Sequence, residues 1–98
     1  MYYERSISGI REAIEEVSPG TKAMESKLVP RQPAPLEYLL WMCEQIEKMD
    51  TTSLDYAIKA GKWIGWVYAH AELNGLWDNC TTRSLAREDK QSGCDKPH

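Results

Sequence analysis

Phenylalanine is absent from this chain of 98 residues, which has only two histidines and three cysteines. No two cysteines are spaced as CxxC, and three widely separated cysteines favour free thiols in a reducing cytoplasm over a secreted disulfide scaffold. The sequence also has no HExxH, no GxSxG and no glycine-rich phosphate loop. Catalysis requires a nucleophile, a base or a metal in a credible arrangement. We therefore expect no enzyme, no catalytic residue and no cofactor.

The chain also lacks an excess of basic residues and a long apolar run. Its formal net charge is −3, and neither half is basic, which argues against a protein built mainly to coat phosphate. The longest helical stretch is interrupted by Lys59, Lys62 and Glu72, whereas a membrane span needs about 20 mostly apolar residues. The start, MYYERSISG, has no apolar run after its charges and does not predict a signal peptide. We expect a cytoplasmic protein.

The periodicity of the apolar residues predicts a single all-α domain over residues 1–98. Four helices are expected, at residues 7–17, 36–49, 53–75 and 82–91. The connection between the second and third is short, so these two form an antiparallel hairpin with the first helix packed across it. Residues 21–35 form a connector, and residues 92–98 are expected to be a flexible tail.

Each of the three longer predicted helices carries an apolar stripe that we expect to be buried. In the first it is Ile7, Ile10, Ile14 and Val17. In the second it is Leu36, Leu39, Leu40, Cys43 and Ile46. In the third it is Leu54, Ala57, Gly61, Ile64, Tyr68, Ala71 and Gly75.

The expected helix ends follow from local residue types. Ser6 is a candidate N-cap of the first helix. Thr52 and Asp55 resemble a capping box at the start of the third. Asn74-Gly75 predicts a left-handed cap at its end.

Three prolines lie within residues 30–35 of the connector. They favour extended polyproline-type backbone and stop any helix. This predicts a stiff linker that wraps the domain. The alternative is a peptide-like segment that docks in an aromatic groove.

A row of small residues runs along the helix at 53–75: Ala57, Gly61, Gly65 and Ala69. Such a row forms a shallow groove that admits a second backbone. Glycine inside a helix costs about 1 kcal/mol relative to alanine, so close packing is expected to offset it. The groove either holds another helix of the same chain or forms the seam of a homodimer.

The opposite side of this helix combines tryptophan with basic residues. The candidate partner-binding residues are Lys59, Lys62, Trp63, Trp66 and His70, with Trp41 of the preceding helix pointing away from its own apolar stripe. Tryptophan is enriched at the energetic centres of protein interfaces. It also stacks on bases where lysine holds the phosphates. Three interpretations therefore stay open: plain core, protein interface and nucleic-acid interface.

Two groups of residues offer weak alternatives of a chemical kind. His70 could act as a base toward Cys43, but Cys43 lies on an apolar stripe, where cysteine behaves as a small apolar residue. Cys80, Cys94 and His98 could hold zinc, but structural zinc sites bring their ligands in close pairs. We predict neither a dyad nor a metal site.

Residues Glu37–Ala71 read EYLLWMCEQIEKMD, a short Thr/Ser cap and AIKAGKWIGWVYA, and LWDNCTTRSLARED follows. This region resembles small accessory proteins encoded by tailed bacteriophages and prophages. The resemblance covers residues 37–90, and it transfers no active residue. It implies a bacterial cytoplasm and a protein that tunes or inhibits a host protein by binding it.

The sequence thus predicts a non-enzymatic protein-binding module, a phage-encoded modulator of a host bacterial protein. Two alternatives are kept. One is a nucleic-acid-binding accessory protein that uses the tryptophan-lysine face, and the other is a structural homodimer built on the small-residue row.

Overall fold

The computed structural model describes the backbone of residues 2–94 and the side chains of residues 2–90. Four helices are formed, and no strand occurs within the described residues. They are α1 (Glu4–Val17), α2 (Leu36–Lys48), α3 (Leu54–Leu73) and α4 (Asn79–Cys94). The predicted all-α class is confirmed.

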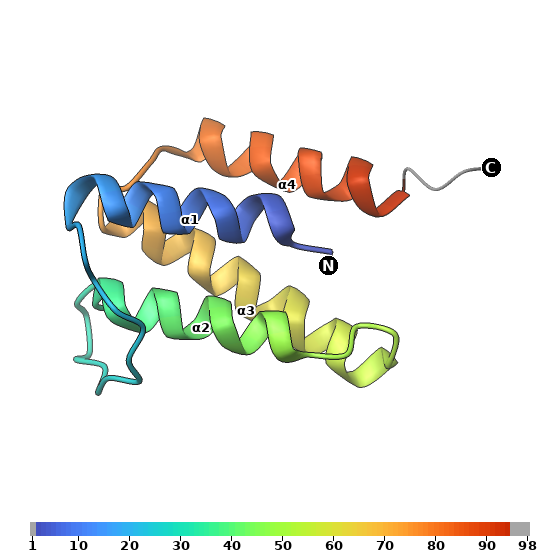
Figure 1. Ribbon diagram of the computed structural model, residues 1–98, viewed down its shortest axis with the longest axis horizontal. Coiled ribbons are helices and arrows are strands. Elements are labelled where there is room, and N and C mark those ends of the chain that lie inside the picture. The colour runs from blue at the N-terminus through green and yellow to red at the C-terminus, as the bar shows by residue number, and fades with distance from the viewer. Residues whose placement is uncertain (1, 95–98) are drawn as a thin grey trace.

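The helices pack as two antiparallel pairs, which Figure 1 shows from one side. A short loop joins α2 to α3 and confirms the predicted hairpin. The first and last helices, α1 and α4, lie alongside each other, and α1 also packs against α2. The first helix therefore lies between the hairpin and α4 and contacts both.

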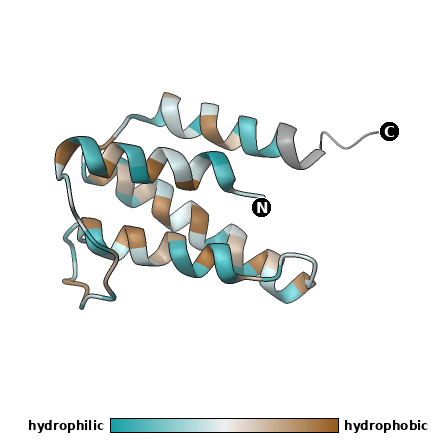
Figure 2. Ribbon diagram, viewed as in Figure 1, coloured by the Kyte–Doolittle hydropathy of each residue, from teal (hydrophilic) through white to brown (hydrophobic). Residues whose placement is uncertain are grey.

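The core is formed by apolar residues of α1, α2 and α3, and polar and apolar residues alternate around each helix (Figure 2). Its most deeply buried members are Ile7, Ile10, Ile14, Leu39, Cys43, Ile46, Ala60, Val67 and Ala71. Fully burying a large aliphatic side chain contributes about 1.5–3 kcal/mol. Four residues of the α2 stripe (Leu39, Leu40, Cys43 and Ile46) and the three isoleucines of α1 were predicted correctly, whereas Leu36 is only half-buried.

Three members of the predicted stripes, Val17, Leu54 and Gly75, are exposed, and two core residues of α3 were missed. Val17 is 61% exposed because α1 ends there, beyond the α2 contact. Leu54 is 75% exposed, whereas Ala60 and Val67 are buried. The side of α3 that is buried therefore differs from the side that the sequence predicted. The reason is that α3 packs on α2 along one side and meets the start of α1 along another.

The first helix begins at Glu4, three residues before the predicted start, and Ser6 is not its N-cap. No side chain of the adjoining segment caps it. Instead, Asp89 of α4 accepts hydrogen bonds from the backbone N–H groups of Arg5 (2.8 Å) and Ser6 (3.1 Å). The first N–H groups of a helix lack partners within the helix, and an acceptor near that end stabilises it. A residue of the last helix thus supplies the cap of the first.

Ser6 is itself buried and links this cap to α3. Its hydroxyl donates to Asp89 and also contacts the hydroxyl of Tyr68. Since the single Ser6 proton points to Asp89, Tyr68 is the donor to Ser6. Burial raises the pKa of Tyr68, which keeps its phenol protonated as this chain of bonds requires.

The end of α3 confirms the predicted left-handed cap. Gly75 has φ = 73°, and its N–H donates to the carbonyl of Glu72 at 3.0 Å. The N–H of Leu76 donates to the carbonyl of Ala71, also at 3.0 Å. These are the two hydrogen bonds of a Schellman motif, and glycine is favoured where φ is positive.

The start of α3 differs from the expected capping box. Ser53 occupies the N-cap position and makes no side-chain cap bond. The Thr52 N–H donates to the carboxylate of Asp50 at 3.0 Å, so Thr52 belongs to a turn before the helix. The Thr/Ser connection is therefore held by an Asx-type turn, a local bond that competes with capping.

The last helix is longer than the predicted 82–91. Its N-cap is Asp78, whose carboxylate accepts from the Thr81 N–H at 3.0 Å, so the helix starts before Thr81 and Thr82. Residues 92–94 of the expected tail form its last turn, and residues 95–98 lie outside the described part of the chain.

Close contact between α1 and α4 depends on Gly9. A Cβ atom on Gly9 would lie 2.9 Å from Cδ1 of Leu85 and 3.2 Å from Cζ3 of Trp77. The absence of a side chain at this position lets the two helices approach.

The proline-containing connector is not a continuous polyproline segment. The N–H of Gln32 donates to the carbonyl of Val29 at 3.2 Å, and Arg31 has φ = 67°. Pro30 therefore occupies the second position of a tight turn, where its fixed φ is favourable. After this turn, Ala34 is buried against α3.

Gly65→Ala is expected to raise the free energy of unfolding by about 0.5–1 kcal/mol, because Gly65 lies in the middle of a helix and a Cβ there meets no atom within 4 Å. Urea denaturation measures the change. Gly75→Ala is the matched comparison and should lower stability, since Gly75 has positive φ. A loss of stability in Gly65→Ala would contradict the finding that no other part of the chain covers α3 at Gly65.

Candidate functional site

Five aromatic side chains form a continuous row across the seam between α2 and α3. We call this row, consisting of Trp63, Trp41, Tyr38, Trp66 and His70, the aromatic row. Ring centroids are 6.2 Å apart for Trp41 and Trp63, 5.4 Å for Tyr38 and Trp41, and 5.7 Å for Tyr38 and Trp66. His70 stacks on Trp66 at 3.8 Å.

Helical spacing places these rings together. Tyr38 and Trp41 are three residues apart on α2, and Trp63, Trp66 and His70 recur at three and four on α3, so each set shares a face. All five are half-buried, and the tyrosine and the tryptophans pack against the core. The tryptophans are thus both core and surface residues, which the sequence left open. Sequence reasoning missed Tyr38, although its spacing from Trp41 was a usable signal.

The His70 end of the row is covered by the chain's own connector. Nδ1 of His70 accepts the Ala34 N–H at 3.0 Å, and the side-chain amide of Asn74 donates to the Ala34 carbonyl at 2.9 Å. Ala34 is only 1% exposed. Both backbone groups of Ala34 are therefore held by the end of α3 and its C-cap residue Asn74, and His70, a candidate partner-binding residue, fixes the connector.

Acid is expected to destabilise the fold through His70. Burial lowers its pKa below the ordinary 6.5, and protonating Nδ1 would remove the acceptor of the Ala34 bond. The stability that depends on neutral His70 is complete above pH 6.5 and is lost as the pH falls from 6.5 through the folded-state pKa. Urea unfolding of the native chain and His70→Gln over this range measures the difference, and equal pH slopes would contradict it.

The Trp63 end of the row opens into a hollow. Its volume is about 300 Å³, and it is lined by Gln45, Lys48, Met49, Asp50, Tyr56, Lys59 and Trp63. We call it the terminal hollow. The Lys59 ammonium lies 5.1 Å from the centroid of the Trp63 ring, a cation–π contact. The predicted partner residues Lys59 and Trp63 therefore lie together at an accessible cavity.

The lysines of the hollow, Lys48 and Lys59, make no ion pair with any residue whose side chain is described. Among the described residues the one ion pair joins Arg11 to Glu47, away from this site. Asp50 is the hollow's only acidic residue. Its carboxylate accepts from the backbone and hydroxyl of Thr52, which lower the pKa of Asp50. Two lysine charges therefore face the hollow without a salt-bridge partner.

The small-residue row does not hold a helix of this chain along its length. A Cβ on Gly61 would lie 3.5 Å from the Tyr3 hydroxyl, whereas Gly65 and Ala69 are exposed. The prediction that another helix of the same chain fills this groove is therefore wrong for its C-terminal half, at Gly65 and Ala69. A homodimer seam there stays a prediction, which sedimentation velocity tests. Three large apolar side chains are exposed on the same helix: Ile58 and Leu73, which the sequence analysis did not single out, and Leu54, which it predicted to be buried.

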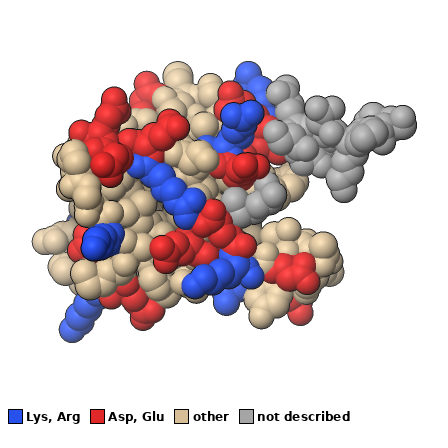
Figure 3. Space-filling model, in the orientation of Figure 1, with Lys and Arg blue, Asp and Glu red and all other residues tan. Residues whose placement is uncertain are grey.

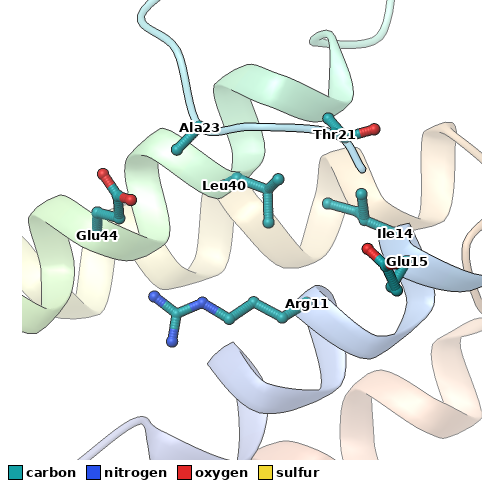
Figure 4. Close-up of a pocket in the computed structure, with 7 residues that line it drawn as sticks. All are labelled: Arg11, Ile14, Glu15, Thr21, Ala23, Leu40 and Glu44. Atoms are coloured by element: carbon teal, nitrogen blue, oxygen red, sulfur yellow. The ribbon is translucent and has the colours of Figure 1, made fainter. Parts of the chain in front are cut away.

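A second hollow, of about 240 Å³, lies between α1, α2 and the connector (Figure 4). Arg11 extends across it, with Glu15 and Glu44 on its sides. The Arg11 guanidinium donates to Glu47 at 3.0 Å, so its charge is already satisfied. The other charged groups that line this hollow are acidic: Glu15, which accepts the Gly20 N–H at 3.3 Å, and Glu44.

The chemical alternatives are not assembled within the described residues. Burial raises the pKa of the Cys43 thiol to about 12, and no hydrogen bond joins Cys43 to His70. Residues 2–90 contain no group of three histidine, cysteine or acidic side chains placed to hold a metal. Cys80 is exposed at the start of α4, and the side chains of Cys94 and His98 lie outside the described part. No described helix is both long and apolar enough to cross a membrane.

Comparison with family models, curated proteins and solved structures found no significant match. The resemblance to phage accessory proteins therefore stays a prediction. The case for a function rests on the aromatic row and the terminal hollow.

Proposed function

We propose that this chain is a non-enzymatic protein-binding module that engages its partner through the terminal hollow and the adjoining part of the aromatic row. By the resemblance to phage accessory proteins, the partner is a host bacterial protein that the chain modulates or inhibits. Lys59, Trp63 and Trp41 are the contact residues, with Lys62 on the next exposed turn of α3.

One observation carries this proposal: a half-buried tryptophan forms the wall of an accessible hollow. Trp63 is held by Trp41 on one side and Lys59 on the other, so its orientation is fixed before binding. A pre-oriented aromatic side chain loses little conformational entropy on association. Such anchors contribute about 2 kcal/mol or more at the centre of an interface.

Nucleic acid is the less well supported partner for this face. Base stacking needs an open ring face, but the Lys59 ammonium lies over the Trp63 ring. On the face of the molecule that Figure 3 shows, lysine and arginine are interspersed with acidic residues, so no continuous basic surface adjoins the tryptophan-lysine face from that side. The net charge of −3 further weakens attraction to phosphate.

The proposal is tested by quantitative affinity capture from a nuclease-treated bacterial lysate with the native chain and Trp63→Ala. We expect a host protein that is retained by the native chain and reduced about tenfold or more by the substitution. Lys90→Ala on exposed α4 is the matched control and should retain the protein.

Circular dichroism must show equal helicity for all three proteins. Retention that does not depend on Trp63, or that occurs only in a parallel lysate without nuclease, would contradict a protein-binding role for this face.

A further inference from the structure

We propose that the terminal hollow recognises an acidic peptide segment, by accepting one apolar side chain of that segment between two lysines that hold flanking Asp or Glu residues. This rests on the proposed protein-binding function and names the chemistry of its partner.

The walls of the hollow suit an apolar side chain. Met49, Tyr56 and Trp63 contribute a thioether and two aromatic rings from α2 and α3. Methionine adapts its shape to different ligands, and aromatic rings provide large apolar area. The volume of about 300 Å³ is at the lower end of the ~300–1,000 Å³ range of ligand pockets. It therefore suits a single inserted side chain better than a large ligand.

The charges around the hollow favour acidic neighbours of that side chain. Lys48 comes from α2 and Lys59 from α3, so a positive group lies on each helix that borders the cavity. Neither makes an ion pair with a residue whose side chain is described, and the single acidic lining residue, Asp50, is ionised and hydrogen-bonded to Thr52. The two lysines and one aspartate give the lining of the hollow a net positive charge, whereas the whole chain has a net charge of −3. Such complementarity steers a partner of matching charge and disfavours others.

The aromatic row limits where the rest of the segment runs. At its far end, His70 and Asn74 hold Ala34 of the connector, so that end is occupied. A bound segment is therefore expected to leave the hollow over Trp63 and Trp41 and to stop before Trp66. The contact is short, which is typical of linear peptide segments rather than of a broad domain interface.

The test is ribosome display of random short peptides on the immobilised full chain, with counter-selection on Trp63→Ala. We expect the enriched peptides to place Asp or Glu beside a Leu, Met or aromatic residue. The best peptide is then synthesised and its Kd measured by fluorescence anisotropy. The double variant Lys48→Glu/Lys59→Glu should weaken it by about tenfold or more, whereas Lys90→Glu should leave it unchanged.

The outcomes separate this inference from the function on which it rests. Trp63-dependent peptides without acidic residues, or with a Kd that charge reversal does not change, would overturn the acidic preference and leave protein binding standing. Absence of Trp63-dependent peptides would overturn the peptide-recognition inference, while lysate capture independently decides protein binding. Trp63-dependent binding of an oligothymidylate more tightly than of the best peptide would overturn it in favour of nucleic acid.

Discussion

Asp89→Ala is expected to lower the free energy of unfolding by about 3 kcal/mol. Asp89 is 2% exposed, and its carboxylate accepts from two backbone N–H groups of α1 and from the Ser6 hydroxyl. Leaving one buried donor without a partner costs about 1–3 kcal/mol. The loss also removes an acceptor from the N-terminus of a helix.

Urea denaturation followed by circular dichroism measures this change, with Glu88→Ala on the exposed side of α4 as the matched control. We expect the control to differ from the native chain by less than about 0.5 kcal/mol. A loss below about 1 kcal/mol for Asp89→Ala would show that water replaces the carboxylate and that α4 contributes little to α1.

Trp66→Ala is expected to cost about 3 kcal/mol, at the lower end of the range for large aromatic side chains in a core. Trp66 packs on the core and contacts both Tyr38 and His70. Its removal opens a cavity in the seam between α2 and α3 and removes the stacking surface of His70. Thermal unfolding measures the loss.

Trp63→Ala serves as the comparison, because Trp63 lies at the open end of the row. We expect a smaller loss of stability, since Trp63 lines the hollow and its removal enlarges a space that is already open. Equal losses for the two variants would contradict the distinction between a structural and an accessible tryptophan. Binding is therefore tested with Trp63→Ala alone, because removing Trp66 would also weaken the fold.

Local sequence patterns predicted most of the fold. Ile7, Ile10 and Ile14 recur at helical spacing and are buried, and Asn74-Gly75 ends α3 as expected. These features depend on neighbours within a turn or two, which periodicity and cap chemistry describe well.

The docking of α4 could not be predicted in the same way. Its sequence has few apolar residues, and its attachment depends on Asp89 and on the absence of a side chain at Gly9. An aspartate in a polar helix normally indicates solvent exposure. Its partners lie more than eighty positions away in the chain, where no local pattern indicates them.

The candidate site was predicted in part. The grouping of Lys59 with Trp63 follows from helical spacing and was recognised. The terminal hollow was not predicted, because its far wall comes from Met49 and the loop at Asp50. The capture of Ala34 by His70 was also missed, since a connector's path depends on tertiary contacts.

The cap that Asp89 provides has a consequence for the order of folding. The α2–α3 hairpin is formed by neighbours in sequence, whereas the bonds from Asp89 to Arg5 and Ser6 span 84 and 83 residues. Contacts of such sequence separation form late, because closing a long loop costs entropy before any contact compensates for it. During synthesis, the first turn of α1 must wait for its acceptor until residue 89 has left the ribosome. The N-terminal helix, although made first, is thus among the last parts of the fold to be completed.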